Sequence, residues 1–415
     1  MKSKPSVQES GIRLCLTLIM GALFLNIQWS AAQEQDSTWV TAWGTSQHVL
    51  GSDELSNITV RMIARITSPG EAVRIRLDNT LGTEPLTIDS AYVGQRMSGA
   101  TLIPDSNRAL SFNGSSTVTV PAGGTIRSDP VRMQVKAYQD LAVSLYLPGN
   151  SINPSMHAGA RVTSYLASND TGNQAADESD VPFTGTTASM YWLKSIDVLT
   201  NESNGAIVMF GDSITDGTCT TVDGYDRWED WLGFRLNANS GQNGNFYTAI
   251  VNEGIGGNTV VAENLQPPPA SAPGILRLDR DVLSHVGVTH VVLFMGTNDI
   301  RREATAATVI AGMQDIIERV RNRGISIIGA TIIPRHNRAA VADNTGWNSA
   351  KTAIRNEVND WIRTQAAFDA VLDFDQVVQD TNPDRILPAY DCDGIHPNVL
   401  GYYEMGRYIP LELFR

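Results

Sequence analysis

The sequence contains little cysteine and no run of basic residues. Only 3 of its 415 residues are cysteine, and 31 Lys and Arg against 44 Asp and Glu give a net charge of −13. An acidic surface repels phosphate, and no Lys- or Arg-rich segment offsets it, so nucleic acid is not an expected partner. After residue 32 no segment is both long enough and apolar enough to span a membrane, which takes ~20 residues.

The overall composition is that of a globular protein. Hydrophobic residues make up 42% of the chain, and 35 glycines bring the apolar share to about half. This composition excludes disorder and a coiled coil as descriptions of the whole chain. At roughly 100–200 residues per domain, the length predicts two domains, or three. We find no internal repeat.

The first 32 residues have the pattern of a secretory signal peptide. Lys2, Lys4 and Arg13 make the start basic, and the segment from Leu14 to Ile27 is almost wholly apolar. Ser30-Ala31-Ala32 then supplies small residues at which a signal peptidase cuts. The apolar run is shorter than a membrane-spanning helix requires. We therefore expect cleavage near Ala32 and a secreted or periplasmic protein.

The number and positions of the cysteines agree with the expectation that the protein is exported. Cys15 lies within the predicted signal peptide, which leaves Cys219 and Cys392. In an oxidising compartment two remaining cysteines can form one disulfide. Two buried free thiols are the alternative. Closing so long a loop would add about 4–5 kcal/mol to the free energy of unfolding in the chain-entropy model, less any strain.

Residues 38–200 are predicted to form an all-β domain. Short segments there alternate in polarity or carry β-branched residues, with Gly, Pro, Asn and Ser between them, and no long helix is evident. We therefore expect an antiparallel β-sandwich of the jelly-roll type. The polar segment Ala167–Asp180 is either a surface loop or a linker. The clearest predicted strands are Asn57–Ile66, Ala72–Leu77, Ser116–Val120 and Leu141–Leu147.

Residues 201–415 are predicted to form an α/β domain. Three apolar strands are expected in this part, and two stretches between and after them have apolar residues at helical spacing. Gly324 is the expected C-cap of the first helix. Strand–helix alternation implies a parallel sheet covered by helices on both faces. The expected strands are Ala206–Phe210, Thr289–Met295 and Ile325–Ile333, and the expected helices are Ala304–Arg323 and Trp347–Ala366.

Two polar motifs follow predicted strands of the parallel sheet. Ser213 lies just past the strand Ala206–Phe210 and is expected to open a helix, whose free N–H groups favour a developing anion. Asn298 follows the strand Thr289–Met295 and can donate a hydrogen bond from its amide. Ligands of open parallel sheets bind beyond the carboxyl ends of the strands. Both side chains are therefore expected in one crevice.

A third motif, near the C-terminus, supplies an acid and a base. Asp393 and His396 lie three residues apart in one tight turn. There the carboxylate can orient the imidazole while the imidazole takes a proton from Ser213. Each motif is weak alone, but together they predict nucleophilic catalysis by serine. The Gly-x-Ser-x-Gly elbow is absent, so the α/β-hydrolase fold is not indicated.

Four blocks of the chain, in order, resemble the SGNH/GDSL hydrolase family. They are Gly211-Asp212-Ser213-Ile214, Asn252-Glu253-Gly254-Ile255-Gly256-Gly257-Asn258-Thr259, Gly296-Thr297-Asn298-Asp299 and Asp393-Gly394-Ile395-His396-Pro397. Ile replaces the Leu that gives the GDSL motif its last letter. The resemblance covers about residues 205–412 and implies a flavodoxin-like three-layer fold and ester hydrolysis. It implies no cofactor and no metal.

The resemblance also implies a role for each matched residue. Ser213 would be the nucleophile, His396 the general base and Asp393 the group that orients His396. The N–H groups of Ser213 and Gly257 and the amide of Asn298 would form the oxyanion hole. Gly256 competes with Gly257 for that role, because neighbouring glycines leave the alignment register open. A Cys219–Cys392 disulfide would tie the nucleophile segment to the Asp393–His396 turn.

The first half resembles the β-sandwich that precedes the SGNH domain in a secreted bacterial subgroup. The matching segments are Trp39–Trp43, Val73–Asn79 and Leu141–Pro148. This domain is expected to support the cleft, with carbohydrate binding as the alternative role. His48 and His157 would border the cleft if the β half packs over it.

Several other residues are given a structural interpretation. Asp373 and Asp375 resemble a glycosidase carboxylate pair, but Phe374 between them favours a strand or turn. His285 and His290 lack metal-ligand spacing and are expected to pack or lie on the surface. Arg335 and His336 follow a strand and are weak candidates for substrate contact. Core or loop positions are expected for Tyr225, Trp228, Trp231 and the segment Pro267–Pro269.

The function expected from the sequence is that of a secreted serine carboxylester hydrolase. Its substrates would be short acyl esters, above all acetyl groups on small molecules or polysaccharides. A medium-chain lipase, an aryl esterase or an acyltransferase with the same triad is the alternative. Binding of carbohydrate by the β half would be an added role.

Overall fold

The computed structural model describes residues 37–242, 245–341, 345–365 and 367–414. The predicted signal peptide and Cys15 lie outside these residues. Within the chain, Asp36–Arg415 form one compact unit, which contains both the β-rich first half and the α/β second half. No helix of the described residues has the length and apolar character needed to cross a membrane.

The first half consists of strands joined by loops, with no helix between residues 37 and 202. In chain order the strands are β1 (Thr38–Gly44), β2 (Val49–Leu50), β3 (Ile58–Arg65), β4 (Gly70–Asp78), β5 (Leu86–Ile88), β6 (Ser90–Ser98), β7 (Thr101–Leu102), β8 (Arg108–Ala109), β9 (Val118–Val120), β10 (Thr125–Arg127), β11 (Val131–Val135), β12 (Asp140–Leu147), β13 (Ser155–His157), β14 (Ser164–Leu166), β15 (Gly185–Thr187), β16 (Met190–Tyr191) and β17 (Leu193–Thr200).

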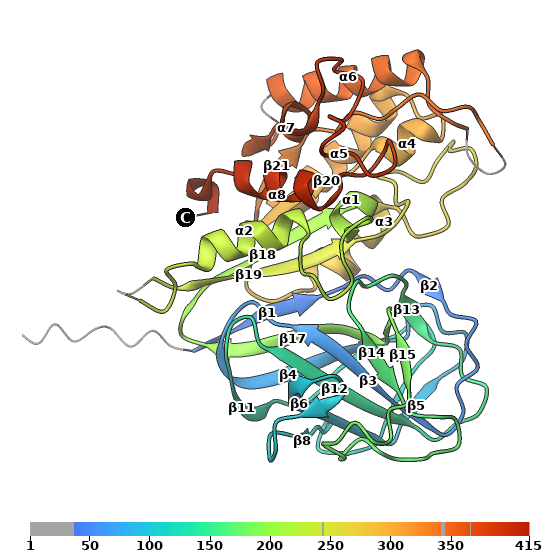
Figure 1. The fold of residues 1–415 in the computed structure, drawn as a ribbon, viewed down its shortest axis with the longest axis vertical. Helices are drawn as coiled ribbons and strands as arrows, with labels where there is room; N and C mark the ends of the chain where they lie inside the picture. Colours follow the sequence, from blue (N-terminus) through green and yellow to red (C-terminus); the bar gives the residue numbers. More distant parts are fainter. Residues whose placement is uncertain (1–36, 243–244, 342–344, 366, 415) are drawn as a thin grey trace, which may run out of the picture. The chain divides into compact units, whose positions relative to one another are not determined.

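These strands pair into antiparallel sheets, as the sequence predicts (Figure 1). One sheet has the order β1-β17-β4-β10, with β11 also paired to β4, and a second has the order β15-β14-β3-β12-β6-β7, with β8 paired to β6. The two smaller sheets are β16-β13-β2 and β5-β9. The polar segment Ala167–Asp180 connects β14 to the turn before β15 and is a surface loop within this half, so the linker alternative is wrong.

The second half is built on a parallel sheet. Its strands are β18 (Ser203–Gly211), β19 (Tyr247–Gly254), β20 (Val288–Phe294), β21 (Ser326–Ala330) and β22 (Ala370–Leu372). Their order, β19-β18-β20-β21-β22, is the flavodoxin-like order 2-1-3-4-5. In that order, the strand sequence reverses between β18 and β20, and ligands of such sheets bind at this point.

Helices cover both faces of the parallel sheet. They are α1 (Ser213–Asp216), α2 (Trp228–Asn237), α3 (Gly274–Leu278), α4 (Thr297–Arg301), α5 (Ala306–Arg321), α6 (Ser349–Thr364), α7 (Phe374–Val378) and α8 (Val399–Tyr408), with a π-helical turn at Asp279–Leu283 and a 3₁₀ turn at Leu411–Phe414. Helices α2, α7 and α8 pack together, as do α3, α5 and α6. The predicted three-layer architecture is therefore confirmed.

The ends of the predicted elements differ by a few residues for identifiable reasons. Helix α5 begins after Thr305, whose hydroxyl accepts a hydrogen bond from the N–H of Thr308 at 3.2 Å. The strand predicted to reach Ile333 ends at Ala330. The N–H and the carbonyl of Ile332 are instead paired with the side-chain amide of Asn359, each at 2.8 Å.

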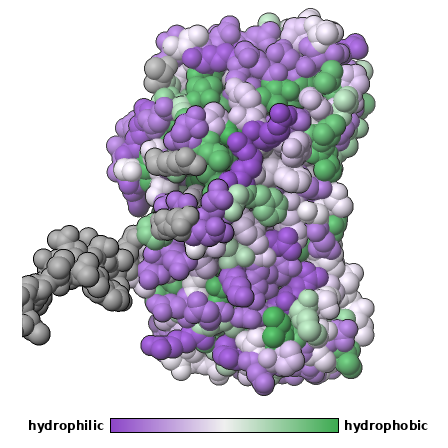
Figure 2. Space-filling model, turned by 60° about the vertical axis from the view of Figure 1, so that its left-hand side comes forward, coloured by the Kyte–Doolittle hydropathy of each residue, from purple (hydrophilic) through white to green (hydrophobic). Residues whose placement is uncertain are grey.

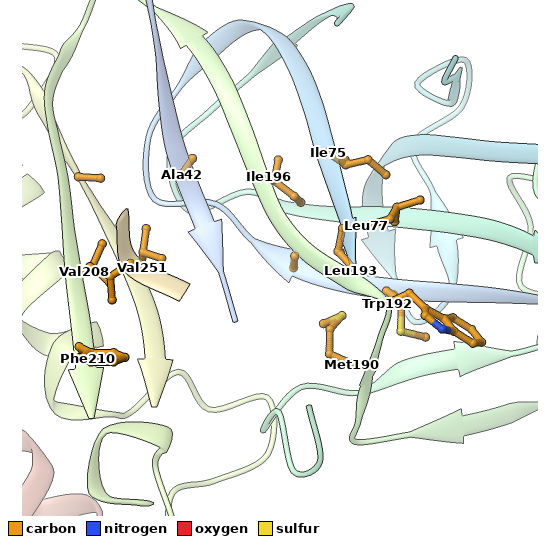
Figure 3. Packing of buried hydrophobic residues seen from close by; sticks show 14 of the residues in the cluster. Ala42, Ile75, Leu77, Met190, Trp192, Leu193, Ile196, Val208, Phe210 and Val251 are labelled. Carbon is orange, nitrogen blue, oxygen red and sulfur yellow. The ribbon is translucent and has the colours of Figure 1, made fainter. Parts of the chain in front are cut away.

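The alternating pattern of β18 divides the core between the two faces of the parallel sheet. Ile207 and Met209 pack with α2, α7 and α8, whereas Val208 and Phe210 belong to the cluster that continues into the β half. Figure 3 shows part of this cluster, where Ala42 and Ile196 come from the antiparallel sheet that contains β1 and β17, and Val251 comes from β19 of the parallel sheet. On the face drawn in Figure 2, hydrophilic residues predominate and hydrophobic residues form small groups between them. One apolar core thus joins the two halves.

Candidate active site

Ser213 stands at the carboxyl end of β18, as predicted. It is the first residue of α1, and the Asp212 side chain before it caps the helix by accepting the N–H of Ile214 at 3.0 Å. The turn is packed closely against the neighbouring strand, because a Cβ on Gly254 would lie 2.3 Å from the backbone nitrogen of Asp216. Only 8% of Ser213 is exposed. The hydroxyl is thus held at the edge of the sheet with little freedom.

The structure brings Ser213, His396 and Asp393 into one hydrogen-bonded chain. Ser213 Oγ lies 2.8 Å from His396 Nε2, and His396 Nδ1 lies 2.9 Å from Asp393 Oδ2. The other carboxylate oxygen of Asp393 accepts the backbone N–H groups of Ile395 and His396 at 3.0 and 2.9 Å. The short turn therefore fixes the carboxylate, and the carboxylate fixes the ring with Nε2 toward the serine.

The turn keeps Asp393 ionised. Partial burial opposes ionisation, but the hydrogen bonds from the His396 ring and from the two backbone N–H groups outweigh it and lower the pKa of Asp393 well below its usual value. A carboxylate in this position holds the proton of the imidazole on Nδ1 and leaves Nε2 free to accept one. This is the protonation pattern that a general base requires.

The two neighbouring glycines differ in how their N–H groups are used. The N–H of Gly256 donates to Asp216 Oδ2 at 3.1 Å. In the described part of the chain the N–H of Gly257 has no partner, and its φ of +72° with open space around the Cβ position suits glycine. Since one N–H is engaged and the other is available, the geometry favours Gly257 over Gly256 as an anion donor.

Asn298 is held beside this loop. It lies in the first turn of α4, after β20, and is 6% exposed. One hydrogen of its Nδ2 is donated to the backbone carbonyl of Asn258 at 3.0 Å, which leaves the second for another acceptor. Asp299 accepts the N–H groups of Val260 and Val261 at 2.9 and 3.0 Å. Helix α4 and the loop that follows β19 and contains Gly256 and Gly257, here called the glycine loop, are therefore joined at two points.

A histidine from the β half supports the same loop. His157, in β13, places Nε2 3.0 Å from Asp216 Oδ1 and Nδ1 2.8 Å from the carbonyl of Ser46. Asp216 is the residue whose other oxygen accepts the N–H of Gly256. Burial disfavours its ionisation, but His157 and Arg227 outweigh that effect and lower the pKa of Asp216. His157 therefore lies behind the glycine loop rather than at a cleft wall.

Sequence reasoning missed Arg277, a fully buried arginine of α3. It donates to the carbonyls of Gly211 and Glu253 at 2.9 and 2.8 Å and to the side chain of Asn258 at 3.0 Å. It also donates to the Ser46 hydroxyl of the β half at 3.0 Å. A single guanidinium thus connects the end of β18, the end of β19, the glycine loop and the other half of the molecule.

Buried ion pairs reinforce the contact between the halves. Lys194, in β17, donates to Glu253 and Asp281 of the α/β half, both at 2.8 Å. His285 lies 2.6 Å from the other oxygen of Glu253, which confirms the structural interpretation of that histidine. Removing one partner of such a network typically costs 3–5 kcal/mol, because it strands a buried charge. The β half is therefore built into the support of the site.

The disulfide Cys219–Cys392 is present, as predicted. Its residues are 173 apart in the chain. The Sγ of Cys219 lies within 4.8 Å of one ligand-type atom each of Asp393 and His396. These three residues do not make a metal site, because the sulfur is bonded in the disulfide and Asp393 and His396 bind each other. The bond joins the segment after the nucleophile to the turn that carries the acid and the base.

We expect reduction of this disulfide to lower both stability and activity. Removing the constraint on the unfolded chain lowers the free energy of unfolding by about 4–5 kcal/mol, which corresponds to a fall in melting temperature of about 5–6 °C in a chain of this size. Scanning calorimetry with and without dithiothreitol measures it, and esterase rates at 25 °C report any loosening of the Asp393–His396 turn. The Cys219→Ala/Cys392→Ala variant is the control, since reductant should leave it unchanged. Equal melting temperatures of the oxidised and reduced protein would contradict the prediction.

We also expect His157→Ala to lower kcat by about 10–100-fold while KM changes less. Without the ring, Asp216 is free to release the N–H of Gly256, and the neighbouring N–H of Gly257 loses its fixed direction. The expected effect is smaller than the ~10²–10³-fold fall in kcat that follows complete loss of one oxyanion donor. Steady-state kinetics together with a melting curve separate this effect from unfolding. His290→Ala in the α/β half is the matched control. Unchanged kcat in His157→Ala would rule out this support.

The remaining predicted residues have structural positions. Asp373 and Asp375 bind Arg363 at 2.7 and 2.8 Å, and Trp228 is fully buried, so neither the carboxylate pair nor this tryptophan is placed for catalysis. His48 packs edge-on against the His157 ring with centroids 4.8 Å apart, and burial lowers the pKa of His48 to about 4. The segment Pro267–Pro269 is held by Arg302, whose Nη1 donates to the carbonyls of its first two prolines.

Comparison with known proteins shows which family the α/β half matches. Residues 209–403 match the sequence model of the GDSL-like Lipase/Acylhydrolase family. No curated protein matches the chain significantly.

Solved structures are similar to about half of the chain. A carbohydrate acetylesterase from Sinorhizobium meliloti is 17% identical over 48% of this chain and 94% of its own, with a TM-score of 0.37. An aryl esterase from M. smegmatis is 18% identical over 50% and 96%, with a TM-score of 0.39. A GDSL-like lipase from Bacteroides thetaiotaomicron is 17% identical over 49% and 85%, with a TM-score of 0.36. Because these identities and TM-scores are low, the family assignment rests on the match of residues 209–403 to the sequence model of the family.

Proposed function

Residues 209–403 belong to the GDSL-like lipase/acylhydrolase family, which makes the chain a carboxylic ester hydrolase, and we propose that it is an exported serine esterase acting on short acyl esters. The observation that carries this proposal is the hydrogen-bonded chain Ser213–His396–Asp393, at 2.8 and 2.9 Å. A hydroxyl, an imidazole and a carboxylate in this order are the groups that acyl transfer through serine requires.

The reaction proceeds through an acyl-enzyme. Ser213 Oγ attacks the ester carbonyl carbon while its proton passes to His396 Nε2. The tetrahedral intermediate collapses, the bond to the alcohol oxygen breaks, and His396 returns the proton to the departing alcohol. Water then repeats the sequence on the acyl-enzyme, giving the carboxylic acid and free Ser213. Asp393 stays ionised throughout and stabilises the imidazolium.

The developing oxyanion is bound by the N–H groups of Ser213 and Gly257 and by the amide of Asn298. The engagement of the Gly256 N–H with Asp216 supports this choice of glycine. Three donors aimed at the oxyanion contribute several kcal/mol, because the loss of one typically costs ~10²–10³ in rate. No cofactor takes part in the proposed mechanism.

Polar surroundings of the serine support a short acyl group. His396 is hydrogen-bonded to Ser213, and Thr297, which precedes Asn298 in α4, is hydrogen-bonded to Arg335, so the side chains that these contacts connect are polar or charged. Each methylene of an acyl chain needs apolar surface to gain its ~0.8 kcal/mol of transfer free energy. An acetyl group needs almost none. The site therefore suits acetyl esters better than long-chain lipids.

Export is supported by the pattern of residues 1–32 and by the Cys219–Cys392 disulfide, because disulfides persist in oxidising compartments. The β half contributes His157 and Lys194 to buried contacts behind the site, which supports a structural role for it. Glycan binding by the β half is tested with the full chain carrying Ser213→Ala, and retention on a polysaccharide would establish that role as well.

The decisive experiment is a series of nitrophenyl esters from two to twelve acyl carbons, with the Ser213→Ala variant beside the parent protein. We expect serine-dependent hydrolysis with a maximum at acetyl. A maximum at long chains would overturn the substrate proposal and point to a lipase. Folded protein that transfers the acyl group to an added alcohol but not to water would indicate an acyltransferase with the same triad.

A further inference from the structure

Arg335 is a buried arginine that forms no ion pair with any of the described residues. It is 5% exposed, and within the described part of the chain its one hydrogen bond is from Nη1 to the Thr297 hydroxyl at 3.4 Å. Its guanidinium carbon lies 5.2 Å from the centre of the Trp347 ring. Arg277 is also buried, at 1% exposed, but donates to five partners. Since buried arginines are normally paired, Arg335 lacks a partner that an anion could supply.

The position of Arg335 is beside the proposed catalytic groups. Thr297, its hydrogen-bond partner, directly precedes Asn298 in α4. His336, the next residue in the chain, donates its backbone N–H to the carbonyl of Gly394 at 2.9 Å, within the turn that carries Asp393 and His396. Arg335 thus contacts the residue next to Asn298, and its chain neighbour His336 contacts the turn that carries His396.

The free part of the guanidinium is reachable. Nε and Nη2 make no hydrogen bond in the described chain, yet neither is among the fully enclosed side-chain atoms that lack a partner. Trp347 is itself held by a hydrogen bond from its indole to the Thr352 hydroxyl at 3.0 Å, so the platform under Arg335 is fixed. A planar fork with two unused donor groups, held on a rigid ring, suits bidentate binding of a carboxylate.

Other positive charges adjoin Arg335. The pKa of Arg335 is lowered to about 10, mainly by burial, and the nearby charges of Arg301 and Arg338 contribute to this lowering. Arg338 donates from Nη2 to the backbone carbonyl of Asp393 at 2.8 Å. Asp212 and Asp393 lie near enough to attract Arg335 but form no ion pair with it, and Asp393 is occupied by His396.

We propose that Arg335 binds a carboxylate carried by the alcohol portion of the ester, so that the preferred substrates are acyl esters of acidic alcohols such as uronic acids. The proposal rests on the proposed esterase function. The protein is acidic overall, with a net charge of −13, but charges beyond about 10 Å are largely screened at 0.1 M salt. The local arginines therefore decide which substrates are favoured at the site.

The test compares two acetyl esters that differ in one carboxylate: 4-acetoxybenzoate and its methyl ester. For the parent protein we expect kcat/KM to be at least tenfold higher for the acid, with the preference falling as salt rises. In Arg335→Gln we expect kcat/KM for the acid to fall about 10–100-fold, mainly through KM, and that for the methyl ester to stay within about threefold. Arg335→Lys should recover part of the preference, and exposed Arg323→Gln is the matched control.

The outcomes separate this inference from the proposed function. Equal losses on both esters in Arg335→Gln would overturn it, because Arg335 would then act on the oxyanion or on folding. Equal kcat/KM values of the two esters in the parent protein would overturn it as well. Failure of the parent protein to hydrolyse either ester would contradict the esterase function itself. Release of acetate from acetylated polygalacturonate faster than from acetylated xylan would extend the result to polysaccharides.

Discussion

Ser213→Ala is expected to remove ester hydrolysis, with kcat falling by about 10⁴–10⁶-fold. The substitution deletes the nucleophile and leaves His396 and Asp393 hydrogen-bonded to each other, so only binding and the oxyanion donors remain. Because the hydroxyl is small and its main partner is the His396 ring at 2.8 Å, the fold should be retained. Initial rates on nitrophenyl acetate, with a melting curve for each protein, measure both effects.

The control for this change is a serine that takes no part in the proposed mechanism. Ser52 is exposed and lies in a loop of the β half, so Ser52→Ala should keep the parent rate. A rate in Ser213→Ala within tenfold of the parent protein would show that another group is the nucleophile. Loss of the melting transition in Ser213→Ala would instead mean that the hydroxyl is needed for folding, and Ser213→Cys would then serve as the conservative replacement.

The sequence predicted the local elements because their signals are local. An apolar run followed by Gly211 and a capping Asp212 identifies a buried strand and a helix start without reference to the rest of the chain. The same holds for Asp393 and His396, whose contact depends only on a turn of a few residues. The order of the motifs and their positions after predicted strands were sufficient to predict that Ser213 and Asn298 lie at one edge of the sheet.

The supporting contacts could not be predicted in the same way. Asp216 is bound by Gly256 from one side and by His157, 59 positions earlier in the chain, from the other. Arg277 meets Ser46, which is 231 positions away. These pairs depend on how the β half packs against the parallel sheet, and polar residues separated by such distances carry no periodic signal. Gly256 and Gly257 became distinguishable for the same reason.

His396→Ala should lower kcat by an amount close to that of Ser213→Ala, about 10⁴–10⁶-fold. Without the imidazole, the Ser213 proton has no acceptor within hydrogen-bond distance among the described residues, and the hydroxyl is a poor nucleophile while protonated. Asp393→Ala should cost less, because His396 can still accept the proton although its ring is no longer fixed at Nδ1. Stopped assays on nitrophenyl acetate rank the three variants, with His290→Ala as the control.

The double variant decides whether the groups act as a unit. If Ser213 and His396 work in one proton transfer, Ser213→Ala/His396→Ala should be no slower than either single variant, since the second substitution removes nothing that still functions. Independent contributions would instead multiply, and the double variant would fall by the product of the two losses. The 2.8 Å contact between Oγ and Nε2 requires the first result. Multiplying losses, or a His396→Ala rate near that of the parent protein, would mean that this contact is not the one through which the serine is activated.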